Sequence, residues 1–194
     1  MEVVAKKKKT ASKRVSRKMS LEKFLQWEQP EDHYKYEWVD GSLEKTEYMM
    51  KNTELFIVKN IQQQFEKTDA KKKGGLLAAE TIVKLSETIV RIPDLAYFSE
   101  KQIVDAYKEN AQPIPTFIIE IISPNEKGTK IERKALEYFE AGVQVIWQVY
   151  PELEMVKVLT SPKLVKVCFE KDVCSAKPAV PGLEITVKEL FGVV

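Results

Sequence analysis

Two carboxylates stand inside apolar stretches of the chain, where a solvated acid is not expected. Glu120 lies at the centre of TFIIEIIS (116–123), and Asp94 heads the apolar run in RIPDLAYF (91–98). Side chains alternate along a strand, so each acid shares one face with apolar neighbours. A buried carboxylate must be paired, protonated or bound to a metal. For Glu120 alone, a structural ion pair with Arg133 or a lysine is a sufficient explanation.

The presence of both acids favours a metal site. Pro93-Asp94 is also ordinary turn chemistry, so that dipeptide does not decide the matter alone. Two acids on adjacent strands, however, suit a hard cation, because Mg²⁺ takes oxygen ligands and is often held by one or two carboxylates plus substrate phosphates. We therefore expect Asp94 and Glu120 to lie on adjacent strands and to share one Mg²⁺, for which Mn²⁺ could substitute.

Two helical residues could complete this site. Glu54 heads the apolar stripe of a helix expected over 52–67, so it should face the sheet, although a first-turn acid also simply stabilises a helix N-terminus. Lys134 lies three residues after Ile131 and four before Tyr138, and it therefore borders the helix face that packs on the sheet. Its ammonium could point at the carboxylates or extend outward to solvent.

The order of apolar segments predicts the elements that position these residues. Helices are expected over 20–29, 52–67, 99–115 and 127–142, the last ending at Gly142. Strands are expected over 76–86, 88–98, 116–123 and 143–150, with hairpins at 34–48 around Asp40-Gly41 and at 154–170, and a closing segment at 181–191. This pattern of helix, strands, helix, strand and C-terminal β extension predicts an α/β or α+β fold with a mixed sheet.

Composition excludes several classes of protein. The chain has 194 residues, 44% of them apolar and 31% charged, which fits one globular domain over 20–194. No apolar run reaches the roughly 20 residues of a membrane helix, and no signal-peptide core follows the basic N-terminus, so we expect a cytoplasmic protein. Cys168 and Cys174 are then expected to be reduced core thiols. His33 is the only histidine, which argues against zinc catalysis and Ser-His triads.

The N-terminal segment differs from the rest in charge. Residues 1–18 carry eight Lys/Arg and one Glu, a net charge of +7, whereas residues 19–194 carry 23 basic and 28 acidic residues, a net charge of −5. High charge and few apolar residues predict a disordered basic tail over 1–19. The tail could neutralise nucleic-acid phosphates. It could equally be an inert solvated segment, or translation could start at Met19.

The order and spacing of these residues resemble the PD-(D/E)XK nuclease superfamily. Within it the chain is similar to a bacterial family described as putative restriction endonucleases, whose biological role is mostly unknown. The resemblance covers about residues 20–194. Its matching segments are YEWVDG (36–41), IPDLAYF (92–98), EIISP (120–124) and KALEYFEAGVQVIW (134–147).

The chain departs from the family pattern at several positions. The superfamily has a lysine at the position of Ile122, and in this family the following helix supplies it, which maps to Lys134. The family often has His near the position of Glu54 and Asp at the position of Lys130. Glu37 matches an acid typical of the family and could join the site or form a salt bridge within its hairpin.

The resemblance implies a metal-dependent endonuclease that hydrolyses DNA phosphodiester bonds. Asp94 and Glu120 would hold Mg²⁺, and Lys134 would stabilise transition-state charge or help to deprotonate a water, with Glu54 and Glu37 as further members of the site. Cleavage of both strands would favour a homodimer. Ile122 and Lys130 leave open a decayed nuclease that binds nucleic acid or a protein partner without cleavage. A structural protein whose acids form plain ion pairs is a third interpretation.

Overall fold

Six strands form the central mixed sheet of the protein. The computed structural model describes residues 18–30, 34–47 and 52–192, so residues 1–17 of the basic tail lie outside the described part. The sheet order is β10-β9-β8-β7-β6-β3, in which β7 and β8 are parallel and the other neighbours are antiparallel. Helix α5 links the parallel pair β7 and β8. This arrangement confirms the expected α+β fold with a mixed sheet.

The elements of the chain run in the following order. They are α1 (Leu21–Leu25), β1 (Tyr34–Val39), β2 (Ser42–Glu47), α2 (Asn52–Phe65), α3 (Asp69–Lys72), β3 (Leu76–Ala79), β4 (Val83–Lys84), β5 (Ile89–Arg91), β6 (Leu95–Phe98), α4 (Glu100–Glu109), β7 (Phe117–Ile121), α5 (Gly128–Ala141), β8 (Val145–Tyr150), a 3₁₀ turn (Pro151–Leu153), β9 (Met155–Ser161), β10 (Leu164–Phe169), β11 (Val173–Ser175), β12 (Glu184–Thr186) and α6 (Val187–Phe191).

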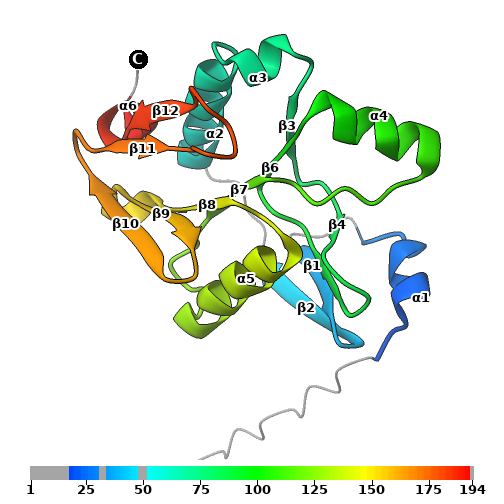
Figure 1. Cartoon of the computed structure of the whole chain (residues 1–194). Coiled ribbons are helices and arrows are strands. Elements are labelled where there is room, and N and C mark those ends of the chain that lie inside the picture. Colours follow the sequence, from blue (N-terminus) through cyan, green and yellow to red (C-terminus); the bar gives the residue numbers. More distant parts are fainter. Residues whose placement is uncertain (1–17, 31–33, 48–51, 193–194) are drawn as a thin grey trace, which may run out of the picture.

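Helix α5 lies on one face of the central sheet, and α2 with the C-terminal β11–β12–α6 segment lies on the other (Figure 1), and each face buries its own apolar core. On one face, Ile119 and its neighbours pack against α2 and the C-terminal β11–β12–α6 segment, where Cys168 and Cys174 are free and buried. On the other face, Ile118 packs with Ala135 and other residues of α5. Strand β7 is therefore covered on both sides, which explains its nearly continuous apolar sequence.

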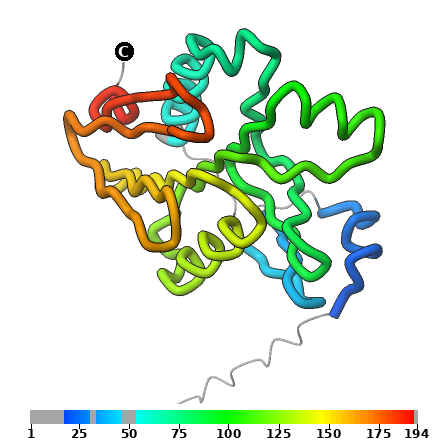
Figure 2. The backbone as a smooth tube through the Cα atoms, in the orientation of Figure 1, coloured from blue at the N-terminus to red at the C-terminus, as the bar shows by residue number. Residues whose placement is uncertain are grey.

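A second sheet, with the order β2-β1-β5-β4, holds the N-terminal hairpin next to α5 (Figure 2). Asp40 and Gly41 have φ values of 48° and 80° at its turn, as expected for a two-residue hairpin loop with positive φ at both positions. Lys18 and Met19 also belong to this region, because Lys18 forms a β-bridge to Ser42 and the amide of Met19 donates to Gly41 at 2.8 Å.

Two expected strands are each divided in the structure. The segment 76–86 forms β3 and β4, separated by Glu80 at φ 49°, and the segment 88–98 forms β5 and β6, separated at Pro93. Proline has no N–H to donate to a β-ladder, so the strand is interrupted there. The two halves of each segment belong to different sheets. Strands β4 and β5 pair with each other in the second sheet, beside β1, whereas β3 and β6 pair in the central sheet.

The helices are shorter than their sequence patterns predict. Helix α2 ends at Phe65, and Thr68 then caps the short helix α3 by accepting the amide of Lys71 at 3.2 Å. Helix α5 ends as expected at Gly142, whose φ of 107° favours glycine. Within residues 18–30, 34–47 and 52–192, no helix has the length and apolarity needed to cross a membrane.

Candidate active site

Strands β6 and β7 place Asp94 and Glu120 beside each other. The register pairs Leu95 with Ile119, and its continuation by one residue sets Asp94 opposite Glu120. Residues directly opposite in an antiparallel pair point to the same face of the sheet. The backbone pairing of β6 with β7 ends at Leu95. Beyond it, Oδ2 of the Asp94 side chain accepts the amide of Ile121 at 2.6 Å. Because the strand is interrupted at Pro93-Asp94, the Asp94 carboxylate replaces a backbone acceptor, and this hydrogen bond fixes its orientation.

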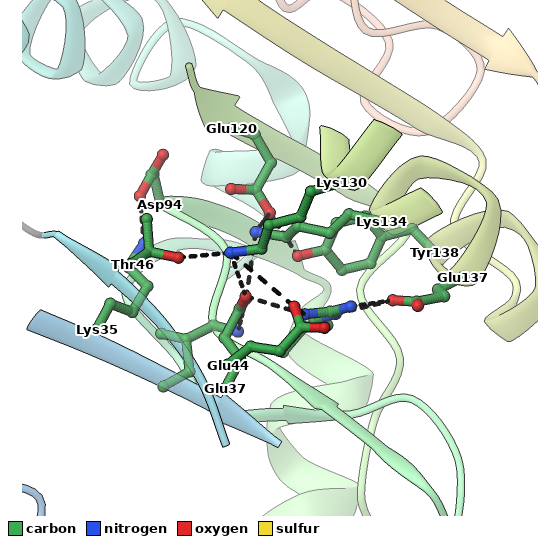
Figure 3. A network of polar contacts seen from close by, with 12 residues as sticks. Lys35, Glu37, Glu44, Thr46, Asp94, Glu120, Lys130, Lys134, Glu137 and Tyr138 are labelled. Carbon is green, nitrogen blue, oxygen red and sulfur yellow. Dashed lines mark hydrogen bonds and ion pairs between the residues drawn. The ribbon is translucent and has the colours of Figure 1, made fainter. Parts of the chain in front are cut away.

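Helix α5 brings Lys134 and Tyr138 over these strands (Figure 3). Nζ of Lys134 lies 2.8 Å from Oε1 of Glu120 and 3.2 Å from Oε1 of Glu37. The hydroxyl of Tyr138, one turn further along, donates to the same Glu120 oxygen at 2.5 Å. All four side chains are buried. The i, i+4 spacing of the lysine and the tyrosine lets both reach one carboxylate.

Strand β1 contributes two charged residues from one of its faces. Glu37 is fully buried, and its Oε1 accepts the amide of Ile92 at 3.1 Å. Two residues earlier, Nζ of Lys35 lies 2.5 Å from Oδ1 of Asp94, and only 12% of its side chain is exposed. Alternate residues of a strand share a face. One strand therefore supplies a cation to Asp94 and an anion to Lys134.

Arg91, fully buried at the end of β5, ties the hairpin to α5. Its NH1 lies 3.0 Å from Glu37 Oε2 and 2.9 Å from Glu44 Oε2, and its Nε donates to Glu137 Oε2 at 2.8 Å. Arg133 is half-exposed and also contacts Glu44, at 2.5 Å, and Glu137, at 3.5 Å. Glu37 is therefore fixed between Arg91 and the lysine of α5.

Lys130 lies on α5, four residues before Lys134. It donates to Oγ1 of Thr46 at 2.6 Å and lies 3.7–4.0 Å from the carboxylates of Glu126, Glu44 and Glu37. The cation therefore joins α5 to the hairpin in an acidic environment. This contact explains how the site region accommodates a lysine there.

The charges of the cluster shift the pKa values of its members. Burial alone would raise the pKa of Glu37, but Lys134 and Arg91 lower it to about 2. Burial would lower the pKa of Lys134, but Glu120 and Glu37 raise it above its usual value. Burial raises the pKa of Glu120, opposed by Lys134 and assisted by Asp94. Lys134 is thus held as a cation between two acids.

The structure assembles Asp94, Glu120, Lys134 and Glu37 in one network. Glu54 lies in the first turn of α2, a half-buried position on a helix whose apolar residues pack on the face of the sheet opposite to Glu120. Ile122 borders a small pocket beside Glu120, together with Lys134 and Tyr138. The lysine beside Glu120 is therefore Lys134 of α5, and position 122, which also borders the pocket, carries no charge.

Lys35 and Arg91 belong to the network but were not among the site residues predicted from the sequence. Lys35 carries a weak signal, because it lies two residues before Glu37 in the expected strand. Arg91 stands in the apolar run that leads to Asp94, where a charged residue requires partners. Neither signal identifies the partner, since both contacts join segments more than 40 residues apart.

The carboxylate pair fits the donor preference of Mg²⁺, which takes oxygen ligands and completes its shell with water and substrate phosphate. Among the contacts between described residues, Oε2 of Glu120 accepts no hydrogen bond, whereas Asp94 uses both oxygens. No cluster of three or more His, Cys, Asp or Glu side chains suited to a metal occurs in the described part of the chain. The protein therefore offers two ligands rather than a complete cage.

A mixed sheet flanked by helices, with acids on adjacent strands and a lysine on the crossover helix, defines a restriction-endonuclease-like protein. The chain belongs to the Uma2 family, described as "Putative restriction endonuclease", whose model matches residues 21–188. A crystal structure of a putative nuclease belonging to DUF820 from Anabaena variabilis is similar, with a TM-score of 0.72 and 21% identity over 89% of this chain and 97% of that one. A search of curated proteins found no match.

Proposed function

We propose that the protein is a metal-dependent endonuclease that hydrolyses DNA phosphodiester bonds. Asp94 and Glu120 would hold Mg²⁺, with Mn²⁺ as a substitute. The observation that carries this proposal is the pair of in-register acids on β6 and β7 with the ammonium of Lys134 at 2.8 Å from Glu120. Membership of the Uma2 family supports nuclease chemistry.

Each residue of the network has a distinct role in this proposal. A bound divalent metal would polarise the phosphate and lower the pKa of a water molecule. The Ile121 amide fixes the orientation of Asp94, and Tyr138 fixes that of Glu120. Lys134 stabilises negative charge that develops on the phosphate, because a preorganised cation in a buried site costs no reorganisation during the reaction.

The proposal also covers the role of Glu37, the assembly of the protein and its location. Glu37 positions Lys134 through their 3.2 Å contact. A homodimer would bring two such sites to the two strands of DNA, and we place the protein in the cytoplasm.

The test is single-turnover cleavage of supercoiled and linear DNA with excess Mn²⁺. We expect the wild type to cleave and Asp94→Asn and Glu120→Gln each to lose at least about 10²-fold in rate, because each removes a charged ligand of the metal. Lys101→Ala is the control, since Lys101 is 83% exposed on α4 and pairs only with Asp105 in the described contacts. Equal rates for the wild type and both acid variants would refute the assignment of the site.

A nucleic-acid-binding protein without cleavage is the second candidate. It is favoured by the contacts of Asp94 and Glu120 with the protein's own cations, Lys35 and Lys134, and by Ile122 in place of a lysine. Salt-dependent DNA binding by a wild type that shows no cleavage in Mg²⁺ or Mn²⁺ would support it.

A further inference from the structure

Lys35 lies at the carboxylate oxygen of Asp94 that no backbone amide engages in the described contacts. Asp94 has two carboxylate oxygens, and Oδ2 is engaged by the amide of Ile121 at 2.6 Å. The remaining oxygen, Oδ1, lies 2.5 Å from Nζ of Lys35. Oδ1 is the oxygen that no backbone amide engages in the described contacts, so a metal ion bound to it would lie beside the Lys35 ammonium, and the two positive charges would repel each other.

The position of Lys35 is built into the fold. Its side chain is 12% exposed, and it projects from β1 on the same face as Glu37, which Arg91 and the Ile92 amide hold in place. Lys35 and Lys134 thus approach the two acids from different elements, β1 and α5 (Figure 3). The lysine stem is flexible, so the ammonium can leave Asp94 without movement of the strand.

The charge balance of the cluster indicates what an exchange would achieve. Asp94, Glu120 and Glu37 carry three negative charges, and Lys35, Lys134 and Arg91 carry three positive charges, so these six residues have a net charge of 0. Removal of the Lys35 ammonium from Asp94 leaves −1, which favours binding of another cation. With a divalent metal bound and Lys35 still close by, the cluster carries +2, which favours an anionic phosphodiester.

We propose that Lys35 is an internal counter-cation that a divalent metal displaces from Asp94, and that the released ammonium then contacts the phosphate of the bound DNA. The proposal rests on the function proposed above and adds a residue to it. Lys35 would stabilise the metal-free site by neutralising Asp94, would lower the affinity for the metal, and would raise the affinity of the loaded site for DNA.

The experiment is a calorimetric titration of the full-length protein with Mn²⁺ alone. Lys35→Met retains the apolar stem and removes the charge, so we expect its Kd for Mn²⁺ to be about tenfold lower than that of the wild type, the equivalent of one charge-assisted hydrogen bond. Lys35→Arg keeps the charge, and we expect its Kd to stay within about threefold of the wild type. Lys84→Met is the matched control, because Lys84 lies in the same sheet and pairs with Glu87.

A second titration measures binding of a short DNA duplex in Ca²⁺, without cleavage. Lys35→Met should bind DNA more weakly than the wild type although it binds Mn²⁺ more tightly, and these opposite directions are not expected of a residue that only supports the fold. Circular dichroism checks folding, and Lys35→Gln replaces Lys35→Met if the latter is unfolded. Unchanged or weaker Mn²⁺ binding by a folded, charge-free variant would overturn the proposal, and so would the absence of Mn²⁺ binding in both proteins. Cleavage by the wild type in such a case would leave the nuclease function intact.

Discussion

Lys134 lies between two buried carboxylates, and this position decides how its substitutions should behave. Lys134→Ala would remove the common partner of Glu120 and Glu37. Loss of one partner from a buried ion pair costs about 3–5 kcal/mol of stability. An activity test of this lysine therefore needs a variant that keeps the charge.

Lys134→Arg provides that variant. We expect it to remain folded but to lose roughly 10²-fold or more in cleavage rate, because the planar guanidinium cannot reproduce a compact ammonium in a closed site. Single-turnover cleavage with excess Mn²⁺ measures the effect, with Lys101→Arg on α4 as the control. A wild-type rate for Lys134→Arg would show that only the presence of a positive charge matters at this position.

Glu37 makes a second prediction at the residue scale. Burial would raise its pKa, but Lys134 and Arg91 lower it from 4.5 to about 2. A depressed folded-state pKa means that the carboxylate stabilises the fold above pH 4.5 and that this contribution disappears as the pH falls toward 2. By linkage it amounts to about 3 kcal/mol. Urea unfolding between pH 5 and pH 2 should show a steeper loss of stability for the wild type than for Glu37→Gln. Parallel curves would contradict the assigned ion pairs.

Local periodicity predicts that Asp94 and Glu120 point to one face of the sheet and that Lys134 borders the helix face packed on it, but it leaves open whether the Lys134 ammonium points at the carboxylates or at solvent. Alternation along the strands and the spacing to Ile131 and Tyr138 depend only on neighbours in the chain. The contact of Lys35 with Asp94 instead depends on how the N-terminal hairpin docks on the central sheet. That docking is set by long-range packing, which single-sequence patterns do not encode.

At the scale of elements, the hairpin β1–β2 is joined to α5 through Arg91. We expect Arg91→Met to destabilise the protein by about 3–5 kcal/mol, because it removes a buried cation that contacts both Glu37 and Glu137. Arg133→Met is a matched control, since Arg133 contacts Glu44 and Glu137 from a half-exposed position and should cost no more than about 1 kcal/mol. Urea denaturation of both variants gives the comparison. Similar losses would show that burial of Arg91 adds nothing.

The division of two apolar segments between sheets shows where element prediction from sequence reaches its limit. Continuous apolarity over 76–86 and 88–98 predicts two strands, and the chain forms four. Pro93 is a visible signal for one interruption, whereas the turn at Glu80 depends on a left-handed residue that composition does not reveal. The break at Pro93 also precedes Asp94, whose side chain rather than its backbone then accepts the amide of Ile121 beside Glu120.

At the scale of the whole molecule, charge is divided between the N-terminal tail and the folded part. Residues 1–17 contain seven Lys/Arg and one Glu, whereas the rest of the chain is acidic overall. Lys18 and Met19 are attached to the hairpin, so a truncation that respects the fold removes residues 1–17. Comparison of the truncated protein with the full chain measures how much the charge of residues 1–17 contributes to DNA binding, while the residues of the proposed site stay in place.

We expect the truncated protein to bind DNA more weakly and with a smaller salt dependence, because the slope of log K against log salt decreases by about 0.9 for each phosphate that the protein no longer neutralises. Fluorescence anisotropy at several salt concentrations measures both quantities. A protein in which residues 1–17 are replaced by an uncharged Gly/Ser segment of equal length is the control. An unchanged slope would show that the tail does not bind DNA.

The most direct test of the central claim is anomalous diffraction from crystals soaked in Mn²⁺. We expect one strong anomalous peak between the carboxylates of Asp94 and Glu120, bonded to both, with the Lys35 ammonium moved away from Oδ1 of Asp94. A Mn²⁺-soaked crystal with no peak at these two residues, and with both lysine contacts unchanged, would contradict the proposed metal-dependent site.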